Sequence, residues 1–113
     1  MVTGSARRVV DENLAPLGLD GLFETIVSGD DVQHGKPDAE PYRTAANRLA
    51  TPPEACLVVE NAPLGIRAAR AAGMRCVALQ TTLAAEELAG AETVFTDVEA
   101  LRAWTLREWS AVE

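Results

Sequence analysis

The sequence predicts an α/β protein with a parallel sheet flanked by helices, and three observations support this prediction. Short apolar, β-branched runs alternate with helical patterns along the whole chain. The run at 55–61, ACLVVEN, is continuously apolar, which is typical of a strand buried on both faces in a parallel sheet. Gly73 directly follows an Ala-rich segment, at a position where helices commonly end. Strands that alternate with helices are joined by right-handed crossovers, so a parallel arrangement follows.

The elements can be justified in order along the chain. Ser5 is placed to cap a first helix, and Pro16 interrupts that helix. Pro37 suits the first position of a second helix, whose apolar stripe is Tyr42, Ala45, Ala46 and Leu49. Residues 1–5 are expected to hold the end of a strand and a turn, and further strands are expected at 23–29, 55–61, 75–80 and 92–97. The helices are expected at 6–18, 37–50, 62–73, 81–90 and 98–109.

Composition limits the class of protein. The 113 residues suffice for one small domain, and 48% of them are apolar. No apolar run is long enough to span a bilayer, and the first residues lack the apolar core of a signal peptide, so we expect a soluble, cytoplasmic protein. The net charge of −7 disfavours nucleic acid and anionic membranes as partners. Cys56 and Cys76 lie in apolar runs without metal-binding spacing, which predicts buried, unpaired thiols.

Three polar clusters follow expected strands, at the sheet edge where open α/β sheets bind ligands. The first is Thr3-Gly4-Ser5, beside a helix N-terminus, where hydroxyls and backbone N–H groups suit a phosphate. The same three residues also fit a simple helix cap around Ser5. The other two clusters contain Lys36 and the Glu60-Asn61 pair, so we expect all three to converge on one site.

Lys36 lies between a glycine and Pro37 at the entrance to a helix, in HGKPDAEPY. A nucleotide-binding P-loop is excluded, because the glycine spacing is too long and Pro37 replaces the hydroxyl residue that would bind magnesium. A lysine beside a helix N-terminus is unfavourable unless an anion lies between them, so Lys36 is a candidate phosphate ligand. His34, the single histidine, is expected to be a solvated loop residue.

Glu60 and Asn61 leave the apolar strand at its ligand-binding end. Carboxylate and carbonyl oxygens are the ligands that Mg²⁺ prefers, and Mg²⁺ usually takes few of them from the protein. The alternative is that Asn61 begins a turn and Glu60 faces solvent. We favour the metal site, because an uncompensated acid here would destabilise a crowded region.

Taken together, VTGS, SGDDVQHGKPDAEPY and CLVVENAPLGIRAARAAGM resemble the haloacid dehalogenase superfamily, in particular its β-phosphoglucomutase-like and phosphoglycolate phosphatase-like branch. The similarity is close over residues 1 to about 80 and looser beyond them. It implies a Rossmann-like core that performs Mg²⁺-dependent phosphoryl transfer on a small phosphorylated metabolite through an aspartyl-phosphate, as a phosphatase or a phosphomutase.

The resemblance also implies roles for individual residues. Thr3 matches the residue that hydrogen-bonds the transferring phosphoryl group, with the Gly4 and Ser5 backbone amides nearby. Lys36 matches the lysine that neutralises the phosphoryl charge and orients the nucleophile. Glu60 and Asn61 match the acidic metal-binding pair, and Asn61 departs from the commoner aspartate, which predicts a weaker hold on the ion.

Two parts of the family pattern are missing. Family members begin with an apolar strand that ends in Asp-x-Asp, and no such motif occurs here. The cap domain is also absent, so we expect 1–113 to be a single incomplete core domain. By resemblance the missing strand lies between the strands that end at Thr3 and Glu60, and its loss exposes unpaired sheet edges. The alternative function is therefore a catalytically inactive module that dimerises or complements a partner chain through the exposed edge.

Overall fold

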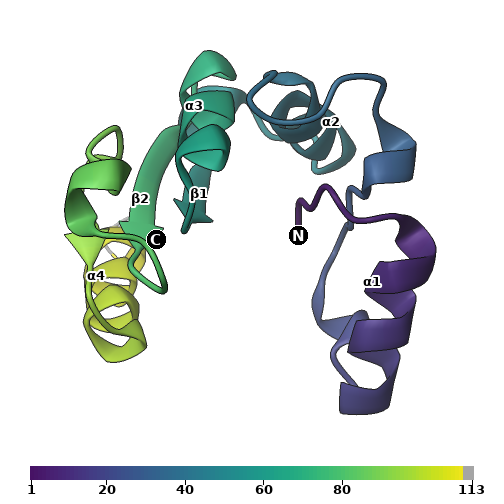
Figure 1. The fold of residues 1–113 in the computed structure, drawn as a ribbon, viewed down its shortest axis with the longest axis horizontal. Helices are drawn as coiled ribbons and strands as arrows, with labels where there is room; N and C mark the ends of the chain where they lie inside the picture. Colours follow the sequence, from purple (N-terminus) through teal and green to yellow (C-terminus); the bar gives the residue numbers. More distant parts are fainter. Residues whose placement is uncertain (111–113) are drawn as a thin grey trace.

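The computed structural model describes residues 1–110 as alternating helical and extended segments (Figure 1). The α-helices are α1 (Arg7–Leu14), α2 (Glu40–Arg48), α3 (Pro63–Ala71) and α4 (Val98–Ser110). The strands are β1 (Leu57–Glu60), β2 (Arg75–Leu79) and β3 (Val94–Phe95). Short 3₁₀ turns lie at Ala15–Leu17, Asp20–Leu22, Gly29–Asp31, Pro53–Ala55 and Ala85–Leu88. Residues 111–113 of the predicted domain lie outside the described residues.

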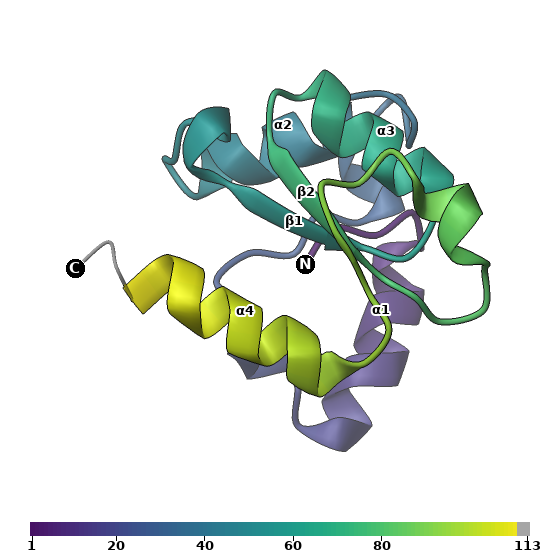
Figure 2. The ribbon, with the colours of Figure 1, turned by 90° about the vertical axis from the view of Figure 1, so that its left-hand side faces the viewer.

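The three strands form a parallel sheet in the order β1-β2-β3, which confirms the predicted fold class. β1 and β2 pair from Leu57 opposite Arg75 to Glu60 opposite Ala78. Figure 2 shows α3 on one side of these strands and α4 on the other. The middle strand β2 is the best covered, and Val77 at its centre is fully buried. The carboxyl end of β1 carries Glu60, as the sequence predicts.

The first two expected strands form a separate ladder and do not extend this sheet. Val2 and Val27 make an isolated parallel bridge. The Thr3 N–H donates to the Val27 carbonyl over 2.9 Å, and the Val27 N–H donates to the Met1 carbonyl over 2.9 Å. Within residues 1–110 the chain therefore holds two parallel ladders, and they are separated where the resemblance places the missing strand.

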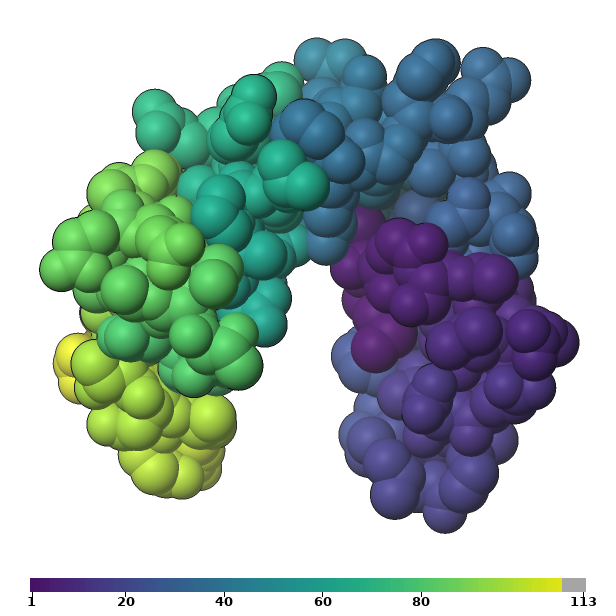
Figure 3. All heavy atoms as spheres, in the orientation of Figure 1, coloured from purple at the N-terminus to yellow at the C-terminus, as the bar shows by residue number. Residues whose placement is uncertain are grey.

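A groove of about 910 Å³ separates this ladder from β1. We call it the central groove, and the residues that matter for its chemistry are Thr3, Lys36, Tyr42, Val59, Glu60 and Asn61. Figure 3 shows the molecule as an arch, with the purple N-terminal part and the green-to-yellow C-terminal part facing each other across the hollow. The groove lies between Thr3 and Glu60, the two residues between which the resemblance places the missing strand.

The buried apolar residues divide in the same way. The larger cluster joins α2, α3 and the sheet, and Ala69 and Ile66 from α3 are almost completely inaccessible. Its α2 members include the predicted stripe residue Ala46. The smaller cluster contains Val10 and Leu14 from α1 together with Ile26, Leu19 packing against it. Each half of the arch therefore has a buried apolar cluster, and Val2 of the first ladder packs against the larger one.

Two expectations about helix starts are wrong. The second helix begins at Glu40 and not at Pro37, which lies in the preceding turn, because Pro41 takes the first-turn position suited to proline. Ser5 does not cap α1: the N-cap position is Ala6, without a side-chain cap. The Asp30 carboxylate instead accepts the Arg7 N–H over 2.8 Å, from a loop that is distant in sequence.

Two further expectations change in detail. The helix predicted at 81–90 is a single 3₁₀ turn. The sequence predicts that β1 is buried on both faces, but Val59 is 48% exposed. Val59 lines the central groove, where no element of the described chain covers it. Gly73, by contrast, has the positive φ of 79° that its predicted helix-terminating position requires.

Cysteine pairing and membrane insertion can be assessed from the described residues. Both thiols are unpaired, as predicted, and Cys76 is buried, but Cys56 is only half-buried where the sequence predicts burial. Across residues 1–110, no helix combines the length and the apolar character that crossing a bilayer requires.

Candidate functional site

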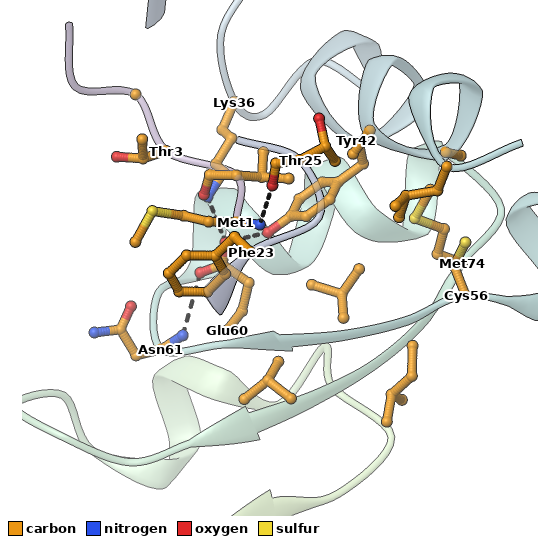
Figure 4. A pocket seen from close by; sticks show the side chains of 18 of the residues that line it. Met1, Thr3, Phe23, Thr25, Lys36, Tyr42, Cys56, Glu60, Asn61 and Met74 are labelled. Carbon is orange, nitrogen blue, oxygen red and sulfur yellow. Dashed lines mark hydrogen bonds and ion pairs between the residues drawn. The ribbon is translucent and has the colours of Figure 1, made fainter. Parts of the chain in front are cut away.

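An ion pair between Lys36 and Glu60 lies at the centre of the candidate site (Figure 4). Glu60 ends β1, whereas Lys36 comes from the loop before α2, so the pair joins segments distant in sequence. The Lys36 Nζ and the Glu60 Oε1 are 2.6 Å apart, and their side chains are 21% and 8% exposed. The sequence predicts an anion beside Lys36, and the Glu60 carboxylate is one such anion.

Tyr42 is the third member of this cluster. Its hydroxyl donates to the same Glu60 Oε1, and its ring centroid is 5.2 Å from the Lys36 Nζ. The sequence identified Tyr42 only as part of an apolar stripe and missed its polar role. A signal was available, because a buried tyrosine hydroxyl normally requires a partner.

These contacts keep the Glu60 carboxylate charged. Burial alone raises the pKa of Glu60, but hydrogen bonds from Lys36 and Tyr42 and the charge of Lys36 outweigh it, so the net pKa lies below its usual value. Burial and the neighbouring Glu60 also raise the pKa of Tyr42, which therefore remains a neutral donor. The neutral phenol of Tyr42 thus donates a hydrogen bond to the charged carboxylate of Glu60 and stabilises its charge.

Thr3 and Gly4 come close to Lys36, as predicted. The Lys36 Nζ also donates to the carbonyl of Val2, the residue before Thr3, over 3.3 Å. Thr3, Gly4 and Lys36 line both the central groove and an adjoining cavity of about 260 Å³. An ammonium has three donors, and Glu60 and Val2 use two, so the third can bind an anion that enters here.

Ser5 is the predicted phosphate residue that the structure does not bring into this group. It lines neither the central groove nor the adjoining cavity. Its backbone N–H donates to the Thr3 Oγ1 over 3.2 Å, so this amide is already occupied. Ser5 therefore orients the Thr3 hydroxyl in this structure.

Asn61 lines the groove beside Glu60. Its backbone N–H donates to the Glu60 Oε2, and its side-chain Nδ2 donates to the Thr81 hydroxyl over 3.2 Å. The Nδ2 contact leaves the amide oxygen of Asn61 as the group that can bind a cation. Glu60 and Asn61, which are consecutive in the chain and both line the groove, thus each carry an oxygen that a cation could bind.

The fit of these residues to Mg²⁺ is adequate but partial. In the described part of the chain, no group of three or more His, Cys, Asp or Glu side chains is arranged to hold a metal. A carboxylate and an amide oxygen are the right donors for Mg²⁺, which commonly takes one or two protein ligands and completes its shell with water and phosphate. Glu60 and Asn61 would therefore supply only part of a magnesium shell.

Gly65, in the first turn of α3, gives the Glu60 carboxylate its space. A β-carbon at Gly65 would overlap both carboxylate oxygens of Glu60. The carboxylate lies against the N-terminal end of this helix, where the helix dipole favours negative charge. The sequence predicts a helix over 62–73 but not the requirement for glycine at this position.

His34 is not part of this site. It is exposed, and its ring Nδ1 lies 3.2 Å from the Glu40 Oε1. Its backbone N–H and that of Gln33 both donate to the Glu40 carboxylate. These contacts lower the pKa of Glu40, with the Gln33 hydrogen bond contributing most. The histidine is a loop residue, as expected, and Glu40 organises the loop that carries Lys36.

The family model for haloacid dehalogenase-like hydrolases matches residues 1–79. A validoxylamine A 7′-phosphate phosphatase from Streptomyces hygroscopicus subsp. limoneus is 41% identical over 102 residues, which are 90% of this chain and 48% of that protein.

Solved structures agree with the family match. A protein from Thermotoga maritima assigned as a β-phosphoglucomutase superimposes with a TM-score of 0.79 at 32% identity, over 89% of this chain and 49% of its own. A haloacid dehalogenase family hydrolase from Deinococcus radiodurans R1, solved with bound phosphate and sodium, gives a TM-score of 0.80 at 30% identity, over 93% of this chain and 50% of its own. The chain spans about half the length of these proteins.

The family match covers most of the chain and includes Thr3, Lys36, Glu60 and Asn61. The structural matches extend the likeness to about nine tenths of the chain, and the resemblance read from the sequence is thereby confirmed. The chain belongs to the haloacid dehalogenase-like hydrolase family.

Proposed function

We propose that the chain supplies the phosphate-binding and cation-binding half of an active site for Mg²⁺-dependent phosphoryl transfer. The substrate would be a small phosphorylated metabolite, and the whole enzyme a phosphohydrolase or a phosphomutase. The observation that carries the proposal is the convergence of Thr3, Lys36, Glu60 and Asn61 on one groove from three separate segments. The relative named as a phosphatase and the hydrolase solved with phosphate support the same reaction class.

Each residue has a role that follows from its chemistry. The Thr3 hydroxyl and the Gly4 backbone N–H would hold phosphoryl oxygens. The remaining Lys36 donor would neutralise charge that develops on the transferring group. Glu60 and Asn61 would hold the cation, which supplies further charge neutralisation when it is bound. Preorganised donors of this kind provide most of the catalysis in phosphoryl transfer.

The covalent step needs a carboxylate nucleophile from outside residues 1–113, because this sequence contains no Asp-x-Asp motif. We propose that an extended segment completes the site from the central groove, beside the unpaired edge of β1. The exposed Val59 side chain and the groove between two parallel ladders support such a partner. A groove filled without any turnover would instead support the inactive-module alternative.

The first test is anion binding by the 113-residue chain. Inorganic phosphate with Mg²⁺ should shift the NMR signals of the Thr3 and Gly4 amides and of the single lysine, and Lys36→Ala should abolish these shifts. Arg67→Ala, which changes an exposed arginine on α3, is the matched control. Phosphate that binds both variants as it binds the wild type would refute the role of Lys36.

Turnover is the second measurement. The chain alone should show no Mg²⁺-dependent hydrolysis of an aryl phosphate such as p-nitrophenyl phosphate, since it lacks the nucleophile. Clear activity that EDTA removes would contradict the assignment of the nucleophile to another segment. In a complete enzyme, Lys36→Ala should remove most of the activity.

A further inference from the structure

The hydroxyl of Tyr42 has no part in the roles assigned above, although it contacts the centre of the site. Tyr42 is the single tyrosine of the chain and lies on the buried face of α2, with 6% exposure. Its hydroxyl donates to one oxygen of Glu60, the same oxygen that Lys36 binds. The proposed chemistry requires a carboxylate at Glu60, but it does not require the hydrogen bond from the Tyr42 hydroxyl.

The two oxygens of Glu60 have different environments. Oε1 accepts from both the Lys36 ammonium and the Tyr42 hydroxyl. Oε2 accepts the backbone N–H of Asn61 over 3.2 Å. Each carboxylate oxygen can accept about two hydrogen bonds or metal contacts. Oε1 is therefore saturated, whereas Oε2 retains one acceptor position beside Asn61.

The surroundings of Glu60 limit how this carboxylate can turn. The backbone of Gly65 in α3 lies directly against the carboxylate, so the carboxylate cannot move toward that helix. Tyr42 holds it from α2, on a rigid ring packed in the larger apolar cluster. Loss of the hydroxyl would leave Lys36, a flexible side chain, as the remaining side-chain donor to Oε1.

We propose that Tyr42 is a positioning residue that fixes which oxygen of Glu60 is available to a divalent cation. By occupying Oε1 together with Lys36, it leaves Oε2, which accepts only the Asn61 backbone N–H, as the cation ligand. This inference rests on the proposed function, because it presumes that Glu60 and Asn61 bind the cation. It adds a residue on α2 to a site otherwise built from loops and the end of β1.

The test uses Mn²⁺ as a paramagnetic probe of the 113-residue chain. In the wild type, Mn²⁺ should broaden the backbone NMR signals of Glu60 and Asn61. Tyr42→Phe keeps the ring but removes the hydroxyl, and it should raise the Mn²⁺ concentration needed for equal broadening about tenfold, as is usual when a residue that orients a ligand is lost. The matched control is Thr44→Val, which removes a hydroxyl bonded to the Glu40 carbonyl on the same helix and should bind Mn²⁺ as the wild type does.

The outcomes separate this inference from the proposed function. Mn²⁺ binding that is equal in Tyr42→Phe and wild type would overturn the positioning role alone. A wild-type chain without selective broadening at Glu60 and Asn61 would overturn both proposals.

A second measurement covers a Tyr42→Phe variant that fails to fold. A ¹³Cζ label on the single tyrosine gives one signal, which Glu60→Gln should move and Thr44→Val should not. A tyrosine signal that ignores Glu60→Gln would show that the hydroxyl does not contact this carboxylate, and the inference would fail.

Discussion

The carboxylate of Glu60 lies directly against the backbone of Gly65, at a place where any β-carbon would overlap it. Glu60 ends β1 and Gly65 lies in the first turn of α3, so a turn of two residues, Asn61 and Ala62, brings the chain back onto its own acid. The position of the carboxylate thus depends on the absence of a β-carbon at Gly65 as well as on the donors Lys36 and Tyr42.

Gly65→Ala should displace this carboxylate and weaken its ion pair with Lys36. We expect a loss of about 1–3 kcal/mol in the free energy of unfolding, the usual range for overpacking a close contact. Urea denaturation measures it. Gly21→Ala is the control, because a β-carbon at Gly21 meets nothing within 4 Å, and its effect should stay within about 0.5 kcal/mol. Equal stability of the two variants would contradict the close contact.

Lys36→Met should strand the buried charge of Glu60 and destabilise the fold by about 3–5 kcal/mol. The double variant Lys36→Met with Glu60→Gln removes that charge, so it should be more stable than Lys36→Met alone. A double-mutant cycle by urea denaturation at pH 7 tests this. Additive losses in the double variant would mean that the pair is not coupled.

Asp31 should contribute to acid sensitivity. Hydrogen bonds from the Ser28 backbone and hydroxyl, together with Arg48, hold the pKa of Asp31 below its ordinary 3.8. A carboxylate whose pKa is lower in the folded state stabilises the fold above its unfolded pKa, and this contribution disappears as the pH falls through the folded value. The Tm of Asp31→Asn should therefore lie below that of the wild type at pH 7, and the difference should shrink below about pH 4.

The control for this prediction is Asp20→Asn, which changes an exposed carboxylate of a 3₁₀ turn and should leave the Tm at pH 7 unchanged. A constant Tm difference between Asp31→Asn and the wild type, down to pH 3, would indicate that the carboxylate charge is not responsible.

The two thiols should react in a fixed order. Burial, with a contribution from Glu60, raises the pKa of Cys76 to about 11, and burial also raises the pKa of Cys56. Because the thiolate is the reactive form, labelling at pH 8 should be slow at half-buried Cys56 and should reach Cys76 only after unfolding. A thiol titration with and without guanidinium measures this, and Cys56→Ala should remove the native-state reaction. Rapid labelling of that variant would contradict the burial of Cys76.

The sequence predicted the parts of the fold that depend on local patterns. The apolar run before Glu60 and the Gly73 stop define the β1–α3 unit because each signal acts within a few residues. The expected convergence of Thr3, Lys36 and Glu60 followed from one rule about parallel sheets, and the central groove brings these residues together.

Other features could not be predicted, because they depend on contacts between distant segments. The Asp30 cap on α1 crosses from a later loop, so no local signal distinguishes it from a cap by Ser5. The hydrogen bond from Tyr42 to Glu60 depends on how α2 packs against the end of β1. The separation of the first ladder from the sheet agrees with the position that the family resemblance gives the missing strand, whereas periodicity along the chain alone does not report strand order.

The division of the apolar core into two clusters has a consequence for how the molecule opens. A polar contact, from Arg48 of α2 to the Ile26 carbonyl and the Asp31 carboxylate, links the cluster around α1 to the rest. Few apolar contacts hold the small cluster, so its amides should exchange with deuterium before those of β2. The chain would then behave as two cooperative units, with the residues of the candidate site distributed between them.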